Sequence, residues 1–211
     1  MSKEKIFGEI DWNSGDVSDG NAKSDFMRLE QGKTRVRIMG DPTQYYIHWV
    51  ENAEGKKRKF NSPIGDPKLV KQLEEAGFKR KASWMIKVLS RVDGEFKLLE
   101  IGSQFYTGVR ELLQDSEWGK PITSYDVTIT RGAPGSQPLY RVTPCPKAPL
   151  EASLKEAFVA FNDRVDLTKL TQPGDPEKIR EFMGWTVSKT ASASPEVEET
   201  EDDFFNFEGD E

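Results

Sequence analysis

The stretch SWMIKVLSRVDGEFKLLEIG, residues 83–102, decides the fold class that this sequence predicts. Two apolar runs rich in β-forming residues flank the turn sequence Val-Asp-Gly-Glu at 92–95. An Asp-Gly pair between such runs is typical of a tight hairpin, because glycine tolerates the backbone conformation that the turn requires. Strands joined by a tight turn are antiparallel, since parallel strands need a long crossover connection. The stretch therefore predicts an antiparallel sheet.

Four further stretches have strand character. TRVRIMG (34–40) alternates between apolar and basic residues, which predicts a half-buried strand with its two guanidiniums on an open face. QYYIHWVE (44–51) is dense in β-forming aromatics, so an aromatic surface is expected on whichever face is not the core. SYDVTITRG (124–132) and PLYRVTP (138–144) are expected to form a second hairpin around a Gly/Pro loop.

Helices are expected between and after these strands. Residues 66–78 have Asp66 as a cap, Pro67 at the first position and a glycine as the stop signal. Further helices are expected in residues 103–118, 149–163 and 175–185. The expected fold class is therefore mainly β with helical additions (α+β). A small, partly open barrel of the oligonucleotide-binding (OB-fold) type fits this order of elements.

Charge is divided unevenly along the chain. Its 211 residues carry a formal net charge of −6, yet residues 195–211 hold nine of the 36 acids and no base. Residues 56–91 hold eleven Lys and Arg against three acids. Such asymmetry indicates nucleic-acid binding, although a solvated lysine-rich surface would have the same composition. We expect a flexible arm at 1–25, one OB-fold domain with helical additions at 26–187 and a disordered acidic tail at 188–211.

Cations and aromatic rings alternate through residues 35–84. Single-stranded nucleic acid requires both, because cations follow the phosphates and rings stack on unpaired bases. Duplex DNA hides its bases, and no helix rich in Arg, Asn and Gln is present to read them. Roughly half of the rings should fill the core of a barrel of this size. The candidate DNA-binding residues are Arg35, Arg37, Tyr45, Tyr46, Trp49, Lys56, Lys57, Arg58, Lys59, Phe60, Lys79, Arg80, Lys81 and Trp84.

No residue pattern typical of catalysis is found, and we expect a non-catalytic protein without cofactor or metal. The one histidine, His48, lies in an expected strand, and the one cysteine, Cys145, lies between two prolines. Walker, G-x-S-x-G and H-E-x-x-H motifs are missing from the sequence. A single cysteine excludes an intrachain disulfide and a Cys-rich zinc site, and no apolar run is long enough to span a membrane. A reducing cytosol is the expected compartment.

Three stretches resemble the single-stranded DNA-binding replication proteins of tailed phages. They are FMRLEQGKTRVRIMGDP (26–42), KVLSRVDGEFKLLEIGSQFYTGVREL (87–112) and YDVTITRGAPGSQPLYRVTPCPKAPL (125–150). The resemblance implies an OB-fold barrel that coats single strands during DNA replication, recombination and repair in the cytoplasm of an infected bacterium. Some members of that family carry a Cys/His zinc module between the second and third strands, whereas residues 56–84 here hold no cysteine. The resemblance therefore implies no zinc for this chain. The basic runs KKRK and KRK, which flank the short helix expected at 67–76, suggest a basic flap beside the DNA-binding groove instead.

The acidic tail contains three phenylalanines, which a tail that only confers solubility does not need. We expect it to dock on phage or host replication and recombination proteins through Asp202, Asp203, Phe204, Phe205 and Phe207. Its carboxylates, tethered at roughly millimolar effective concentration, are also expected to cover the basic groove until DNA displaces them. Self-association on DNA stays open. So do three other functions: strand annealing in recombination, RNA-binding regulation and metal-dependent cleavage of DNA.

Overall fold

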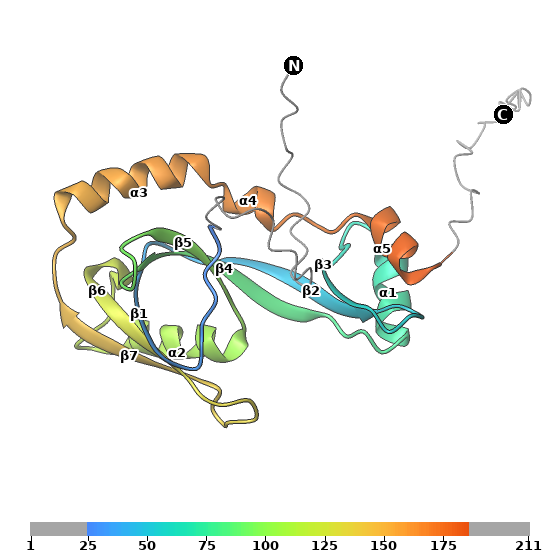
Figure 1. The fold of residues 1–211 in the computed structure, drawn as a ribbon, viewed down its shortest axis with the longest axis horizontal. Helices are drawn as coiled ribbons and strands as arrows, with labels where there is room; N and C mark the ends of the chain where they lie inside the picture. Colours follow the sequence, from blue (N-terminus) through green and yellow to red (C-terminus); the bar gives the residue numbers. More distant parts are fainter. Residues whose placement is uncertain (1–24, 186–211) are drawn as a thin grey trace, which may run out of the picture.

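Every ladder of the sheet is antiparallel, as the hairpin at residues 83–102 predicts. The computed structural model describes residues 25–185, so the expected tail and all but the last residue of the expected N-terminal arm lie outside the described residues. Within that part of the chain, seven strands form one sheet and several helices surround it (Figure 1). An antiparallel sheet with added helices confirms the α+β class.

The ten-residue strand β4 (Lys81–Ser90) organises the sheet. One edge of β4 pairs with β5 (Phe96–Ile101), its hairpin partner. The other edge pairs with β2 (Thr43–Glu51) and then with β1 (Gly32–Ile38), because the chain bends between these strands and continues along the same edge. Gly40, with a φ of 142°, supplies a backbone conformation at this bend that other residues rarely adopt.

The half of the sheet around β1 curls over the main core (Figure 1). Its strand path, β5-β4-β1-β6-β7, continues through β6 (Tyr125–Arg131) and β7 (Tyr140–Lys147). Helix α2 (Ser103–Gln114) and a short 3-10 turn, η1 (Ile122–Ser124), connect β5 to β6. Alternate residues of these strands meet in the core, which includes Val36, Val88, Leu99, Phe105 and Val127.

The segment that leads into β1 links β5 to the end of β6. The Met27 amide donates a hydrogen bond of 2.8 Å to the carbonyl of Leu98 in β5. Arg131, at the end of β6, donates from Nη1 to the carbonyl of Leu29 at 2.5 Å. Met27 and Leu29 also pack against the main core. Residues 27–29 therefore join two parts of the curled sheet that lie far apart along its strand path.

The other half of the sheet extends as an arm, made of β2, β3 (Lys57–Asn61) and the first half of β4 (Figure 1). Helices α1 (Pro67–Glu75) and α5 (Pro176–Met183) pack at its end around Val50, Leu69, Leu73 and Ile179. Asp66 caps α1 by accepting a hydrogen bond from the Leu69 amide at 3.0 Å, and Pro67 occupies the first helical position. These are the cap and the first residue that the sequence predicts.

A C-terminal strap, residues 150–185, fastens the curled half of the sheet to the arm. Helix α3 (Ala152–Arg164) packs Phe158 and Phe161 against the outer side of β4 and β5. After the short helix α4 (Leu167–Leu170), the strap reaches β3, where Asn61 donates to the carbonyls of Leu170 and Gln172. Among the described residues, no helix has both the length and the apolar character needed to cross a membrane.

Candidate nucleic-acid interface

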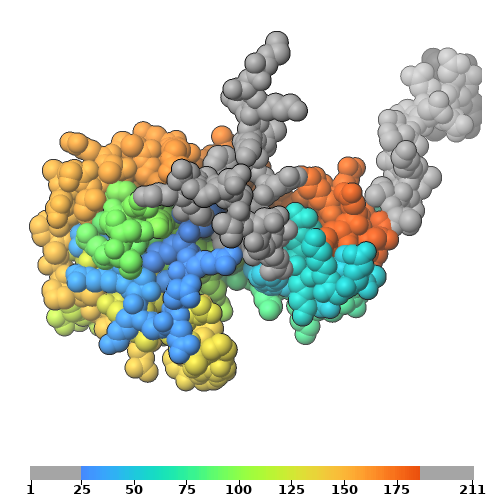
Figure 2. All heavy atoms as spheres, in the orientation of Figure 1, coloured from blue at the N-terminus to red at the C-terminus, as the bar shows by residue number. Residues whose placement is uncertain are grey.

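A groove of about 840 Å³ lies beside β5, between the arm and the base of the β6–β7 hairpin. In the space-filling view, the arm stands apart from the curled half of the sheet, with a notch between them at the lower edge (Figure 2). The groove takes its lining from the arm, from β5, from residues 27–30, from the end of β6 and from the start of β7. The charged basic and aromatic residues of that lining are Arg28, Trp49, Lys59, Lys81, Arg131 and Tyr140.

Trp49 is the most exposed aromatic side chain among the described residues, at 45%. It lies on β2 directly opposite Lys59 of β3, and its face of the strand is shared with Ile47, which pairs with Lys81 of β4. Lys59 and Lys81 therefore lie on the two strands that border Trp49, on the same face of the arm. An exposed ring with cations on either side can stack on a base while the cations contact the phosphates next to it.

Lys59 is held in place by an acidic residue at the floor of the groove. Its ammonium forms an ion pair with Glu100, which also accepts a hydrogen bond from Ser83 Oγ at 2.9 Å. Burial, followed by the charge of Glu100, raises the pKa of the neighbouring Tyr45 phenol well above its ordinary value. The positive charge of Lys59 is therefore largely compensated, whereas Lys81 and Arg28 are exposed.

The opposite wall of the groove is formed by Arg131 and Tyr140, which pair with each other across the β6–β7 ladder. Tyr140 packs edge-on against Phe105 of α2, with ring centroids 6.5 Å apart. The sequence interpretation missed both residues, and Arg28 as well. The signal was available, because Arg131 and Tyr140 flank the Gly/Pro loop of the second predicted hairpin.

The second exposed ring of the arm, Tyr46, points to the other face of β2. It is 39% exposed, and the guanidinium of Arg80 lies 4.9 Å from its ring centroid. Arg58 lies over the ring of Phe60 at 5.0 Å, and Phe60 in turn contacts Phe182 of α5 edge-on. The two basic runs of the sequence therefore border both faces of the arm. Their remaining members, all exposed, are Lys56, Lys57 and Lys79.

Three candidate DNA-binding residues are buried: two of the five candidate rings, in line with the expectation that about half fill the core, and Arg37, for which the expected open face is wrong. Trp84 is in the main core, stacked on Tyr106 at 4.3 Å, because β4 turns its even-numbered residues inward. Tyr45 packs under α3. Arg37 is 1% exposed, since Asp126 and the carbonyl of Ala148 both accept hydrogen bonds from its guanidinium. The tail candidates, Asp202, Asp203, Phe204, Phe205 and Phe207, lie outside the described residues.

His48 and Cys145 have structural surroundings. Nδ1 of His48 lies 2.7 Å from the carbonyl of Phe78, and Nε2 lies 3.1 Å from Ser62 Oγ, in the buried centre of the arm. Cys145 is half-buried, with its sulfur 3.4 Å from the hydroxyl of Thr128. Within residues 25–185, no group of three or more His, Cys, Asp or Glu side chains is arranged to hold a metal ion.

Sequence comparison identifies a phage relative of this chain. No protein-family model matches the chain. A protein of Escherichia phage T5, named "Probable ssDNA-binding protein", is 25% identical over 150 residues, a match that covers 61% of this chain. The match spans 58% of the length of the T5 protein. The chain is therefore similar to a phage single-stranded DNA-binding protein at modest identity.

Proposed function

We propose that this chain is a non-catalytic, sequence-tolerant single-stranded DNA-binding protein. The observation that carries the proposal is the exposed indole of Trp49 between Lys59 and Lys81, in a groove whose other wall holds Arg131 and Tyr140. Rings and cations on both walls suit a strand whose bases are unpaired and can stack. A duplex would need cations but has no free base faces for the rings. The name of the T5 relative supports the same ligand.

The strand path supports a partly open OB-fold barrel as the scaffold of this groove. In an OB fold, five strands form the barrel, and ligands bind beside the second and third strands, between the loops that join strands one to two and four to five. Here the path β5-β4-β1-β6-β7 has five strands, with α2 between the third and fourth in chain order. The arm then corresponds to the connection between strands one and two of an OB fold. Residues 132–139 correspond to the connection between strands four and five. The groove lies between these two connections.

We propose that the protein coats and protects single strands during phage DNA replication, recombination and repair. The coating would occur in the cytoplasm of the infected bacterium. The tail residues Phe204, Phe205 and Phe207, surrounded by carboxylates, suit the apolar pocket of a replication or recombination enzyme. We therefore propose that the body binds DNA and that the tail recruits such a partner.

The test is a titration of the full chain with oligo-dT, oligo-U and duplex DNA of equal length, followed by tryptophan fluorescence. Oligo-dT should quench the fluorescence and bind more tightly than duplex. Trp49→Ala should weaken oligo-dT binding by about 1–3 kcal/mol, roughly 5- to 150-fold, because one base loses its stacking partner. Tyr46→Ala, an exposed ring on the opposite face of the same strand, should cost less.

Four outcomes would point elsewhere. Equal affinity for duplex and oligo-dT would contradict the proposal. Preference for oligo-U would favour the RNA-binding alternative. Rapid pairing of complementary strands on protein rings or filaments would favour the annealing alternative, and cleavage of single strands in Mg²⁺ or Mn²⁺ would favour a nuclease.

A further inference from the structure

A second basic surface lies on the outer face of the curled sheet, away from the groove. Alternation along β1, β6 and β7 turns residues such as Val36, Ile129 and Val142 toward the main core and their neighbours outward. Besides the buried Arg37, four of these outward or adjoining positions carry cations. We call them the outer cation strip, and they are Lys33, Arg35, Arg91 and Arg141.

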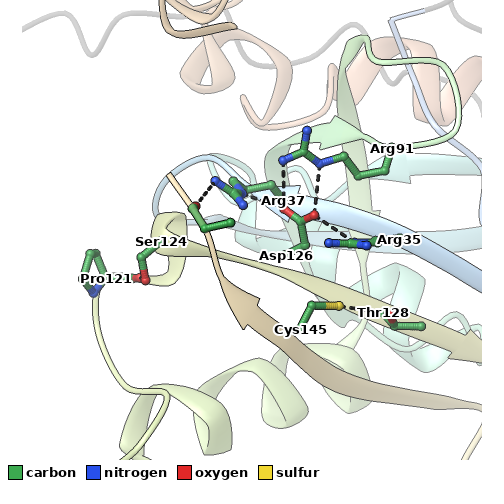
Figure 3. Close-up of polar contacts among 9 residues, drawn as sticks. Arg35, Arg37, Arg91, Pro121, Ser124, Asp126, Thr128 and Cys145 are labelled. Carbon is green, nitrogen blue, oxygen red and sulfur yellow. Dashed lines mark hydrogen bonds and ion pairs between the residues drawn. The ribbon is translucent and has the colours of Figure 1, made fainter. Parts of the chain in front are cut away.

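Asp126 holds the centre of the strip. Arg35 Nε donates to this carboxylate at 2.9 Å and Arg37 Nε at 2.6 Å, while Arg91 donates twice, at 3.0 and 3.1 Å (Figure 3). Burial alone raises the pKa of Asp126, but the hydrogen bonds and charges of Arg91 and Arg37 outweigh burial and leave the pKa below its ordinary value. One ionised carboxylate therefore faces three guanidiniums, and the cluster keeps a surplus of positive charge.

The surplus charge is presented to solvent in a fixed position. Arg37 is buried and is also bound to the carbonyl of Ala148, so its guanidinium is closed to solvent and serves the buried carboxylate. The side chain of Arg35 is 54% exposed and that of Arg91 is 27% exposed. Two guanidiniums beyond what the pairing needs are thus oriented by Asp126 while part of each remains accessible.

The strip begins at the ends of strands that border the groove, but on the opposite face of the sheet, because successive strand residues point to opposite faces; a DNA strand would pass around these strand ends to reach it. Arg131, in the wall of the groove, pairs with Gly32, which precedes Lys33. Tyr140, in the same wall, precedes Arg141. Beyond them, alternate residues of β1 reach Arg35 after about 7 Å, the rise of two strand residues. A cation at every second residue suits the repeating phosphates of an extended single strand.

The strip differs from the groove in chemistry. Its surroundings on β6 and β7 are hydroxyls, at Thr128, Thr130 and Thr143, and the exposed large apolar side chains of the described residues include no aromatic on these strands. Cations and hydroxyls bind phosphate oxygens, whereas stacking on bases requires rings. The strip is therefore suited to the backbone of a strand and carries no information about its bases.

We propose that the outer cation strip is a second phosphate-binding track, which carries the DNA strand onward after it leaves the groove. The proposal rests on the proposed single-stranded DNA binding, and it adds a route and a larger binding site. The groove anchors bases and phosphates together, and the strip then neutralises further phosphates by charge alone. Longer strands should therefore bind more tightly than short ones, and added salt should weaken this additional binding.

The test uses the full chain and oligo-dT of about four to sixteen nucleotides, the range of site sizes that OB folds occupy. The variant Lys33→Gln/Arg141→Gln removes two strip cations for which no ion-pair partner is found within residues 25–185. It should bind short oligo-dT as the wild type does and long oligo-dT more weakly. Its plot of log affinity against log salt for the long strand should be shallower by about 1.4, or 0.7 for each lost phosphate contact.

Two more double variants separate the strip from a general effect of charge. Arg35→Gln/Arg91→Gln should reproduce the length-dependent loss, and its thermal unfolding reports whether Asp126 still has sufficient partners. Lys68→Gln/Lys71→Gln on α1 removes the same charge from an exposed helix, and it should leave the dependence on length unchanged.

The outcomes distinguish the track from the proposed function. Wild-type affinity and salt slope for long oligo-dT in both strip variants would overturn the track while leaving groove binding intact. An equal loss for short and long strands would also overturn it, because the strip would then act through total charge or through the groove. Failure of the wild type to prefer single strands would remove both proposals, and that result appears before any variant is made.

Discussion

Asp126 is the residue on which the outer surface of the curled sheet depends. It is 2% exposed and accepts hydrogen bonds from three arginines that come from β1 and from the end of β4. Removing one partner of a buried ion pair leaves uncompensated charge, which costs more than the pair itself contributes. In this cluster the loss of a single carboxylate would leave three guanidiniums close together.

Replacement of Asp126 by Asn should lower the free energy of unfolding at neutral pH by about 3 kcal/mol or more. Because the pKa of Asp126 is lowered in the folded protein, its ionisation favours folding above the ordinary aspartate pKa. That contribution is lost as the pH falls through the lowered pKa, so the wild type should weaken below about pH 4. Urea unfolding from neutral pH to about pH 2 measures both effects, and the variant should lose less on acidification.

Asp41→Asn is the matched control, since Asp41 is an exposed aspartate at the bend between β1 and β2. It removes the same charge and should change the free energy of unfolding by less than about 0.5 kcal/mol. Equal stability of Asp126→Asn and the wild type at neutral pH would show that the cluster contributes nothing to folding.

The sequence could not predict which side chains of the candidate site are exposed. Alternation correctly separated Val36 from its two arginine neighbours, but it could not tell that Asp126 and the carbonyl of Ala148 cover Arg37 and leave Arg35 exposed. Those partners lie 89 and 111 residues away in the sequence. Trp49 and the exposed basic residues were found because a ring among cations is a local pattern, whereas burial depends on what packs from afar.

At the scale of elements, contacts with the C-terminal strap hold the arm in position. Gly174, between α4 and α5, passes so close to β3 that a Cβ on it would lie 2.1 Å from the carbonyl oxygen of Asn61. Its amide also donates to the carbonyl of Ser62. Farther on, Arg180 of α5 forms an ion pair with Asp66, the cap of α1. Three contacts in a short span thus attach the strap to the arm.

Gly174→Ala should destabilise the protein by about 1–3 kcal/mol, because the new methyl group meets backbone that cannot move without breaking the β2–β3 ladder. Thermal unfolding measures the change, and hydrogen exchange should show it in α1, α5 and β3 before the curled sheet. Gly65→Ala is the control: it lies near the same helices, and nothing lies within 4 Å of its Cβ. Similar melting temperatures for the two variants would mean that the strap does not clamp the arm.

The sequence predicted most elements from local signals. The Asp-Gly turn, the Gly/Pro loop and the cap of α1 lie where the structure has them. It did not assign β3 or α4, since the cationic run at residues 56–60 lacks alternation and α4 has only four residues. The sequence also does not reveal that β2 and the first half of β4 extend away from the curled half of the sheet to form an arm (Figure 1). Pairing partners set that arrangement, and they are not visible in the strand sequences themselves.

At the scale of the whole molecule, the body and the tail carry opposite charge. Residues 195–211 hold nine acids and no base, so residues 1–194 carry all 30 basic residues and 27 acids. Phosphates bound in the groove would meet the same cations that the tail can reach. If the carboxylates occupy those cations between binding events, DNA must displace them, and this competition lowers the net affinity for DNA.

Deletion of residues 195–211 should therefore tighten binding to oligo-dT at low salt, with the difference shrinking as salt rises, because screening weakens the tail and the DNA alike. Salt titrations of the full and shortened chains, followed by tryptophan fluorescence, measure the effect. Changing Phe204, Phe205 and Phe207 together to Ala keeps every carboxylate, so this variant should bind oligo-dT as the wild type does. If it instead tightens binding as much as the deletion does, the rings and not the charge would occupy the groove. If the two chain lengths bind equally at low salt, the tail does not cover the groove at all, and recruitment of a partner would remain its proposed role.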